Sequence, residues 1–182
     1  MSLKVSVYVA QSLDGYIARE DGNLDWLDAY NAIIPKGEDL GYATFMDSVD
    51  ALVMGRNAYE KVLSFGEWPY KDKRVIVLSS RPLEIPNAIS KYVSHSSESP
   101  EVLYKRLSDE GVKKIYIDGA NTIQRFLRAG LVDELIITLI PTLLGSGISL
   151  FGKLAVDIQL KLISSNGYDF GFTQLTYSVA NK

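Results

Sequence analysis

The chain contains no cysteine among its 182 residues. This absence excludes disulfide bonds, thiolate catalysis and cysteine-ligated metal sites. There is also a single histidine, His95, in the polar segment V-S-H-S-S-E-S-P, where we expect a solvated loop. A Ser-His-Asp triad would have to use this histidine, and a zinc site would need three carboxylates or waters beside it. If the chain is an enzyme, a bound cofactor is therefore the expected source of its reactivity.

Long apolar runs are missing too, which argues against a transmembrane helix. The start, M-S-L-K-V-S-V-Y-V-A, is too short and too regularly alternating for a signal peptide. The formal net charge is −3 and the positive residues are scattered, so we expect neither a nucleic-acid nor a membrane partner. Hydrophobic residues make up 47% of the chain, enough for a real core. We expect one cytoplasmic globular domain over residues 1–182.

Short apolar runs alternate with amphipathic segments along the chain. Strands are predicted over residues 4–10, 51–54, 74–78, 114–117 and 134–140, with 89–93 as an edge strand and 158–164 and 172–179 as a closing pair. Helices are predicted over residues 23–30, 39–49, 57–63, 100–109 and 120–129, and a loop over 11–23. Alternation of this kind gives right-handed crossovers and a mostly parallel sheet. The sequence predicts an α/β three-layer sandwich that ends in an antiparallel pair.

Two glycines stand between a predicted strand and a predicted helix, in V-M-G-R-N-A-Y-E and in I-Y-I-D-G-A-N-T-I-Q. The free N–H groups at helix N-termini attract anions, and glycine lets a ligand approach the backbone. Gly55 and Gly119 could therefore hold a pyrophosphate between them. Ser79, Ser80 and Arg81 follow another strand and suit a phosphate monoester, which favours NADP over NAD. Neither junction matches G-x-G-x-x-G, and both glycines could simply be turns.

Six motifs, taken in their order along the chain, resemble a known family, although each motif alone is not specific. V-A-Q-S-L-D-G-Y-I-A, D-W-L, V-M-G-R-N-A-Y-E, V-I-V-L-S-S-R, Y-I-D-G-A-N-T-I-Q-R-F-L and G-L-V-D-E-L-I-I-T-L-I-P-T-L-L-G-S-G-I-S-L-F follow one another along most of the chain. In this order they resemble the dihydrofolate reductase-like superfamily. The most similar branch includes the C-terminal reductase domain of the bifunctional riboflavin-biosynthesis deaminase-reductase. The resemblance implies an NADPH-dependent reductase.

The same resemblance implies roles for particular residues. The nicotinamide of the cofactor would contact Ala10 and Ile17. The rest of the cofactor would contact the two junctions and the turn after the strand at 74–78. These residues are Gly55, Arg56 and Asn57 at the first junction, Asp118, Gly119, Ala120, Asn121 and Thr122 at the second, and Ser79, Ser80 and Arg81 on the adenosine side. Asp14 would shape a mobile loop over the substrate pocket. Trp26 would line the pocket or fasten the loop, and Phe45 would stack on a flat heterocycle or pack in the core. Asp39, before its helix, is either the catalytic acid or a helix cap.

The sequence departs from the family pattern at two positions. Asp118 stands where dihydrofolate reductases carry the first of two glycines joined by a cis peptide, and Ala58 stands where a threonine is usual. The resemblance implies a pteridine- or pyrimidine-like substrate, with 5-amino-6-(5-phosphoribosylamino)uracil as the named case. The alternatives are dihydrofolate reductase activity and a catalytically silent NADP-binding module. Because the sequence has no zinc-ligand pattern, we expect no deaminase domain within residues 1–182. A homodimer is also implied by the resemblance.

Overall fold

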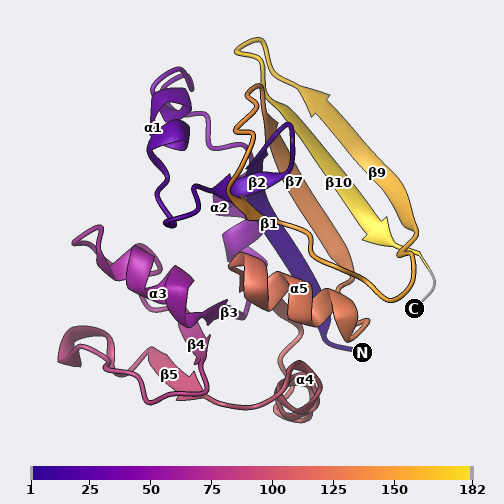
Figure 1. The fold of residues 1–182 in the computed structure, drawn as a ribbon. Coiled ribbons are helices and arrows are strands. Elements are labelled where there is room, and N and C mark those ends of the chain that lie inside the picture. Colours follow the sequence, from indigo (N-terminus) through magenta and orange to yellow (C-terminus); the bar gives the residue numbers. More distant parts are fainter. Residues whose placement is uncertain (1, 181–182) are drawn as a thin grey trace.

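The computed structural model describes residues 2–180. Its main feature is an eight-stranded sheet in the order β5-β4-β3-β6-β1-β7-β10-β9 (Figure 1). The strands are β1 (Lys4–Ser12), β2 (Tyr16–Ala18), β3 (Ala51–Gly55), β4 (Arg74–Leu78), β5 (Val93–Ser96), β6 (Lys114–Asp118), β7 (Glu134–Ile140), β8 (Ile148–Ser149), β9 (Leu160–Gly167) and β10 (Thr173–Val179). The helices are α1 (Asp25–Asn31), α2 (Tyr42–Asp47), α3 (Arg56–Leu63), α4 (Pro100–Asp109) and α5 (Ala120–Arg128).

Strands β5, β4, β3, β6, β1 and β7 are all parallel. Strand β10 runs antiparallel to β7 and to β9. This confirms the predicted α/β architecture, with its mostly parallel sheet and antiparallel C-terminal pair. Parallel strands that each feed a helix bring the strand ends and the helix N-termini to one edge of the sheet. That edge is where the sequence places its candidate site residues.

The helices cover the sheet on two faces, as a three-layer sandwich requires. One core packs Leu103 and Leu107 of α4 and Ile123 and Phe126 of α5 against the sheet. The opposite core packs α2 and α3 against the same strands and includes Tyr116. The central strands read as continuous apolar runs because both of their faces are buried. Val53, Ile76 and Ile117 are examples, each fully inaccessible to solvent.

Several elements differ from the sequence-based predictions. The predicted edge strand at 89–93 is wrong: Asn87–Ile89 forms a short 3₁₀ helix, and the edge strand is β5. His95 therefore lies on a strand rather than in the expected loop, although it is exposed. The predicted helix at 39–49 is shortened to α2 because Gly41, with φ +81°, sets its start. The loop predicted for 11–23 contains β2, which pairs with β8 in a second small sheet.

Candidate active site

The two glycine junctions are in contact with each other. Strands β3 and β6 are neighbours, so Gly55 and Gly119 end adjacent strands at the same edge. A Cβ placed on Gly55 would lie 2.9 Å from Thr122 Oγ1, and one placed on Gly119 would lie 3.2 Å from the Ala58 Cβ. Both glycines are needed for this approach. Because no space separates the junctions, an anion would lie across both of them rather than between them.

Both helices that follow these junctions begin without a side-chain cap. Gly55 is the N-cap of α3 and Gly119 is the N-cap of α5, and neither has a side chain to satisfy the first-turn N–H groups. Asn57 and Asn121 lie exposed in these first turns, while Ala120 and Thr122 are buried. Uncapped N-termini that point to the same edge combine two sets of free N–H groups and two helix dipoles. This arrangement fits the pyrophosphate of a dinucleotide.

The guanidinium of Arg56 forms hydrogen bonds with other residues of the chain. Its Nε donates to Ser79 Oγ at 3.0 Å and its Nη1 to Glu60 at 3.2 Å. Its Nη2 donates to the carbonyl oxygens of Arg81 and Pro82. Four of the five guanidinium N–H donors are thereby used. Arg56 thus holds the turn after β4 against the start of α3, and it has one donor left for a ligand.

Arg81, in the turn after β4, is the cationic side chain available to a ligand. Arg81 is exposed, and its guanidinium makes no hydrogen bond within residues 2–180. Ser80 beside it is exposed as well. His95 on β5 lies with its Nε2 2.7 Å from the carbonyl oxygen of Ser79, so that nitrogen carries the proton and donates. Arg56 and His95 therefore bind the turn after β4, whereas the guanidinium of Arg81 has its donors available for a phosphate.

The loop after β1 is fastened to the loop after β7. The Asp14 carboxylate accepts from Ser12 Oγ at 2.5 Å, from Leu144 N at 3.1 Å and from Gly145 N at 2.8 Å. These bonds hold the pKa of Asp14 below its ordinary value, with the Ser12 hydroxyl as the first cause. Asp14 is thus an exposed loop anchor. Ala10 and Ile17 stay half-buried on either side of this loop.

The two predicted aromatic pocket residues are both buried. Trp26 packs with Ile140 and Phe172, and its Nε1 has no hydrogen-bond partner among the described residues. Phe45 packs on Tyr8 and Tyr116, with ring centroids at 4.9 and 5.2 Å. These contacts describe core residues. Packing alone explains the position of Phe45, and its direct contact with a substrate stays a prediction.

Asp39 caps the start of α2. Its carboxylate accepts from Gly41 N and Ala43 N, each at 2.9 Å. These backbone bonds lower the pKa of Asp39, the bond from Ala43 being the first cause. A carboxyl with a lowered pKa releases its proton more readily than an ordinary aspartate. Of the two roles left open by the sequence, the contacts favour the helix cap over the proton donor.

Asp118 combines partial access to solvent with a raised pKa. It ends β6 on the same face as Tyr116, two residues earlier, and the only hydrogen bond of its carboxyl within residues 2–180 comes from Gly119 N at 2.8 Å. Burial raises its pKa, although the residue is still partly reached by solvent. Dense protein around a group that solvent still reaches means that the group is recessed. The contact of Asp118 with the cofactor, which the resemblance implies, stays a prediction.

The charge of Asp118 also acts on two tyrosines that the sequence did not single out as site residues. Tyr42 begins α2, and Tyr70 lies in the loop after α3. Burial and then the Asp118 charge raise the pKa of Tyr42 to about 12, and the same two causes raise the pKa of Tyr70 further. Tyr70 is 9% exposed, whereas Tyr42 is 37% exposed.

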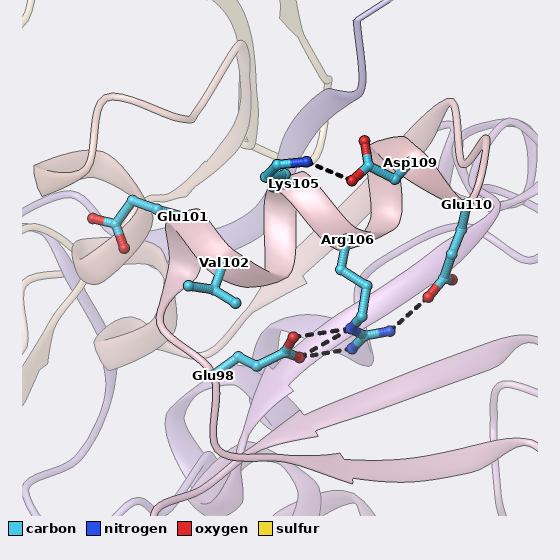
Figure 2. Close-up of a pocket in the computed structure, with 7 residues that line it drawn as sticks. All are labelled: Glu98, Glu101, Val102, Lys105, Arg106, Asp109 and Glu110. Atoms are coloured by element: carbon cyan, nitrogen blue, oxygen red, sulfur yellow. Dashed lines mark hydrogen bonds and ion pairs between the residues drawn. The ribbon is translucent and has the colours of Figure 1, made fainter.

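Elsewhere, a shallow groove of about 700 Å³ runs along α4 and contains none of the predicted site residues. Figure 2 shows that most of its charged side chains are paired: Arg106 bridges Glu98 and Glu110, and Lys105 bonds Asp109. We assign these pairs to the stability of the helix surface. Among residues 2–180 there is no cluster of side chains suited to a metal ion, and none of the helices has the length and apolarity to cross a bilayer.

Comparison with known proteins places the chain in a family. Residues 3–173 match the family model of the RibD C-terminal domain. The chain belongs to the RibD C-terminal domain family. It is 39% identical to the uncharacterized protein YwjB of Bacillus subtilis over 166 residues, 89% of this chain and 90% of YwjB. A Shewanella sp. PV-4 protein provisionally assigned to riboflavin biosynthesis has a crystal structure with a TM-score of 0.92 and 40% identity, covering 98% and 100% of the two chains.

Two more distant structures share the fold of this RibD-type domain. The deaminase/5-amino-6-(5-phosphoribosylamino)uracil reductase of Thermotoga maritima gives a TM-score of 0.72 at 15% identity, over 98% of this chain and 57% of that one. The dihydrofolate reductase of Enterococcus faecalis gives 0.64 at 19% identity, over 98% and 97%. The domain therefore has the dihydrofolate reductase-like fold that the sequence predicted, and it belongs to a family of NADPH-dependent reductases.

Proposed function

We propose that the protein is an NADPH-dependent reductase of a pyrimidine- or pteridine-like heterocycle or its ribosylamino derivative. The observation that carries the proposal is the contact between the uncapped N-termini of α3 and α5, with Asp118 recessed beside them. When bound, NADPH would supply a hydride from C4 of its nicotinamide ring. The residues that would hold it are Gly55, Gly119 and the first-turn amides for the pyrophosphate, and Ser80 and Arg81 for the adenosine phosphate.

The protein's own contribution would be orientation and a proton. Hydride addition to a C=N or C=O bond leaves a negative charge on nitrogen or oxygen, which a proton must neutralise. Asp118 is the recessed carboxyl at this edge, and burial lets it hold its proton at higher pH than an ordinary aspartate does. The Asp14 bonds would position the covering loop beside Ala10 and Ile17. Chemical turnover would then depend on geometry fixed before the substrate arrives.

The test is a pair of titrations followed by a turnover assay. NADPH and NADH are each titrated into the protein while the fluorescence of Trp26 and Trp68 is followed. We expect tighter binding of NADPH. Oxidation of bound NADPH is then measured with 5-amino-6-(5-phosphoribosylamino)uracil and with dihydrofolate. Turnover of the uracil derivative supports the riboflavin-type reaction, and turnover of dihydrofolate supports the alternative. Binding without either turnover would favour a silent nucleotide-binding module, and no binding would refute the proposal.

We also propose that the protein is a homodimer that uses β9. Figure 1 shows β9 in yellow at the outer side of the sheet, and all eight of its residues are exposed. Leu160, Leu162 and Ile163 are 40%, 51% and 59% exposed. An edge strand rarely exposes three large apolar side chains. A second copy offers the same edge in the opposite direction, so two β9 strands can pair about a twofold axis.

Sedimentation of three proteins tests this association. The unaltered chain should sediment as a dimer, and Leu162→Glu should dissociate it because a charge would be buried at the proposed interface. Val102→Glu is the control, since Val102 is 55% exposed on α4, which Figure 1 shows apart from β9. A monomer at every concentration, or a dimer that Leu162→Glu leaves intact, would contradict the assignment.

A further inference from the structure

The loop after β1 and the loop after β7 form one flap, defined here as residues 12–18 and 142–150. Strand β2 of the first loop pairs antiparallel with strand β8 of the second. Leu150 N donates to the Gly15 carbonyl oxygen at 2.9 Å, which adds a backbone bond between the loops. Asp14 accepts from two backbone N–H groups of the second loop. These bonds hold the two loops together as a single unit.

The two strands of the flap approach each other so closely that position 147 requires glycine. A Cβ on Gly147 would clash with the carbonyl oxygen of Ala18 at the end of β2. Ile17, on the same strand, is half-buried and packs against the core that also contains the inner face of α5. The flap therefore carries Ile17 on a closely packed pair of strands, next to the core of that helix.

Gln124 of α5 anchors the flap to the helix. Its Nε2 donates to the Ser149 carbonyl oxygen at 3.0 Å and to the Leu150 carbonyl oxygen at 3.4 Å. The Leu150 side chain is fully buried in one core with Ile123 of the same helix. Polar and apolar contacts thus both join α5 to the end of β8. Because Leu150 N bonds to Gly15, this anchor also reaches the first loop of the flap.

Gly152 leaves the room that the Gln124 amide occupies. A Cβ at position 152 would lie 2.5 Å from Gln124 Oε1 and 2.9 Å from Gln124 Cδ. The backbone of Gly152 is outside the left-handed region, so alanine would not be strained there. Alanine at this position would act by displacing the Gln124 amide from its two carbonyl partners. Gly152 therefore offers an independent way to disturb the anchor.

Helix α5 carries both this anchor and one of the proposed phosphate-binding N-termini. Gly119 is its N-cap, and Gln124 lies in its second turn. The helix is held on the sheet because its inner side chains, Ile123 and Phe126, are fully buried. In the proposed function the pyrophosphate lies at the start of α5 and the nicotinamide lies beside Ile17. Gln124 therefore joins the two parts of the chain that one dinucleotide would have to contact together.

We infer that Gln124 is a positioning residue, which fixes the flap relative to the N-terminus of α5 before a dinucleotide binds. A flap that is ordered in advance costs a ligand less free energy than a flap that the ligand must order itself. Gln124 therefore strengthens the binding of ligands that contact both α5 and the flap, and it does not affect ligands that contact α5 alone. The inference rests on the proposed function, which gives the two ends of the cofactor to α5 and to Ile17.

The test compares two ligands by calorimetry: NADP⁺, and 2′-phospho-ADP-ribose, which has the same phosphates but no nicotinamide. Gln124→Met keeps the length of the side chain and removes its N–H donors. It should weaken NADP⁺ binding by about fivefold, the worth of one hydrogen bond, and leave 2′-phospho-ADP-ribose binding unchanged. Gly152→Ala should have the same selective effect. Arg128→Ala is the control, since Arg128 is exposed on α5 and makes no hydrogen bond within residues 2–180.

Amide hydrogen exchange in the free protein examines the anchor directly. The Leu150 amide, which bonds to Gly15 across the flap, should exchange about fivefold faster in Gln124→Met than in the unaltered protein. Arg128→Ala should leave this rate unchanged. Circular dichroism checks the fold of each variant, and Gly152→Ala carries the same test if Gln124→Met does not fold.

Several outcomes would overturn the inference. An equal loss of affinity for both ligands in Gln124→Met would show a general effect on α5 instead of a placement of the flap. Unchanged NADP⁺ affinity, or unchanged exchange at Leu150, would show that other contacts hold the flap. No binding of either ligand to the unaltered protein would refute the proposed function. Binding of both ligands, without a difference between Gln124→Met and Arg128→Ala, would refute the inference alone.

Discussion

Gly119 packs directly on Ala58, so that a Cβ at position 119 would lie 3.2 Å from the Ala58 methyl carbon. This contact joins the second junction to the first turn of α3. It also gives a physical reason for alanine at position 58, where the family usually carries threonine. A larger side chain there would crowd the Gly119 backbone. Alanine at position 58 therefore permits the close approach of the two helix N-termini.

Gly119→Ala should destabilise the protein by about 1–3 kcal/mol, because alanine would be strained at φ +86° and would press on Ala58. Urea unfolding measures this. Gly111→Ala is the matched control, since Gly111 has φ +81° with nothing within 4 Å of its Cβ position. The excess loss at 119 over 111 measures the crowding. Equal losses would show that the two junctions do not press on each other.

Asp118 should make the protein less stable as pH rises. Burial raises the folded-state pKa of Asp118 above its ordinary value of 3.8, so the folded state binds the proton more tightly than the unfolded state does. Stability therefore falls as pH rises from 3.8 through the raised pKa. Asp118→Asn should remove this slope, as measured by urea unfolding across that window. A variant with the slope of the unaltered protein would show that Asp118 titrates normally.

Arg81 and Arg56 should differ in how they affect cofactor choice. Arg81→Ala should weaken NADPH binding by about tenfold and leave NADH binding unchanged, because only NADPH carries the adenosine phosphate. Arg56→Ala should weaken both nucleotides and lower stability, since it frees the turn that bonds to Ser79 and Arg81. Calorimetry with each nucleotide separates the two. A selective loss of NADPH in Arg56→Ala would reverse the assignment.

Asp14→Asn should loosen the two loops that Asp14 joins. The N–H groups of Leu144 and Gly145 would lose a charged acceptor, so their amide hydrogen exchange should quicken by about tenfold. Asp21→Asn is the control within the same loop, because the one acceptor bond of Asp21 within residues 2–180 is from Asn23 N. Unchanged exchange at Leu144 and Gly145 in Asp14→Asn would mean that the loops are held by other contacts.

The fold was largely predictable where local signals agreed. Helix α4 matches its predicted bounds because Ser99 caps it, Pro100 begins it and Gly111 follows it. Strands β4 and β7 also match, since their apolar runs are bounded by polar turns. Strand β5 was missed because Val93 is its only buried residue, which leaves no alternation to detect, while Ile89 is buried by a 3₁₀ turn.

The candidate site was predictable only in part. The two glycine junctions carry a local signature, and the structure brings them together as adjacent strands require. The recessed position of Asp118 has no such signature. It depends on β3 lying between β4 and β6 in the sheet, which a spacing pattern does not encode. Asp39 was a candidate catalytic acid because it precedes a helix, and its bond from Ala43 N at the start of that helix explains its position without a catalytic role.

Strand β1 lies between β6 and β7, so within residues 2–180 it pairs with segments that are synthesised more than a hundred residues later. During synthesis its apolar face must wait for Ile115 and Leu135 to emerge. Such distant pairing makes folding slow and leaves the early chain open to aggregation. Shielding of Val5 and Val7 by a chaperone would matter most in this interval. Truncations that end before β7 should accordingly yield insoluble chains rather than smaller folded domains.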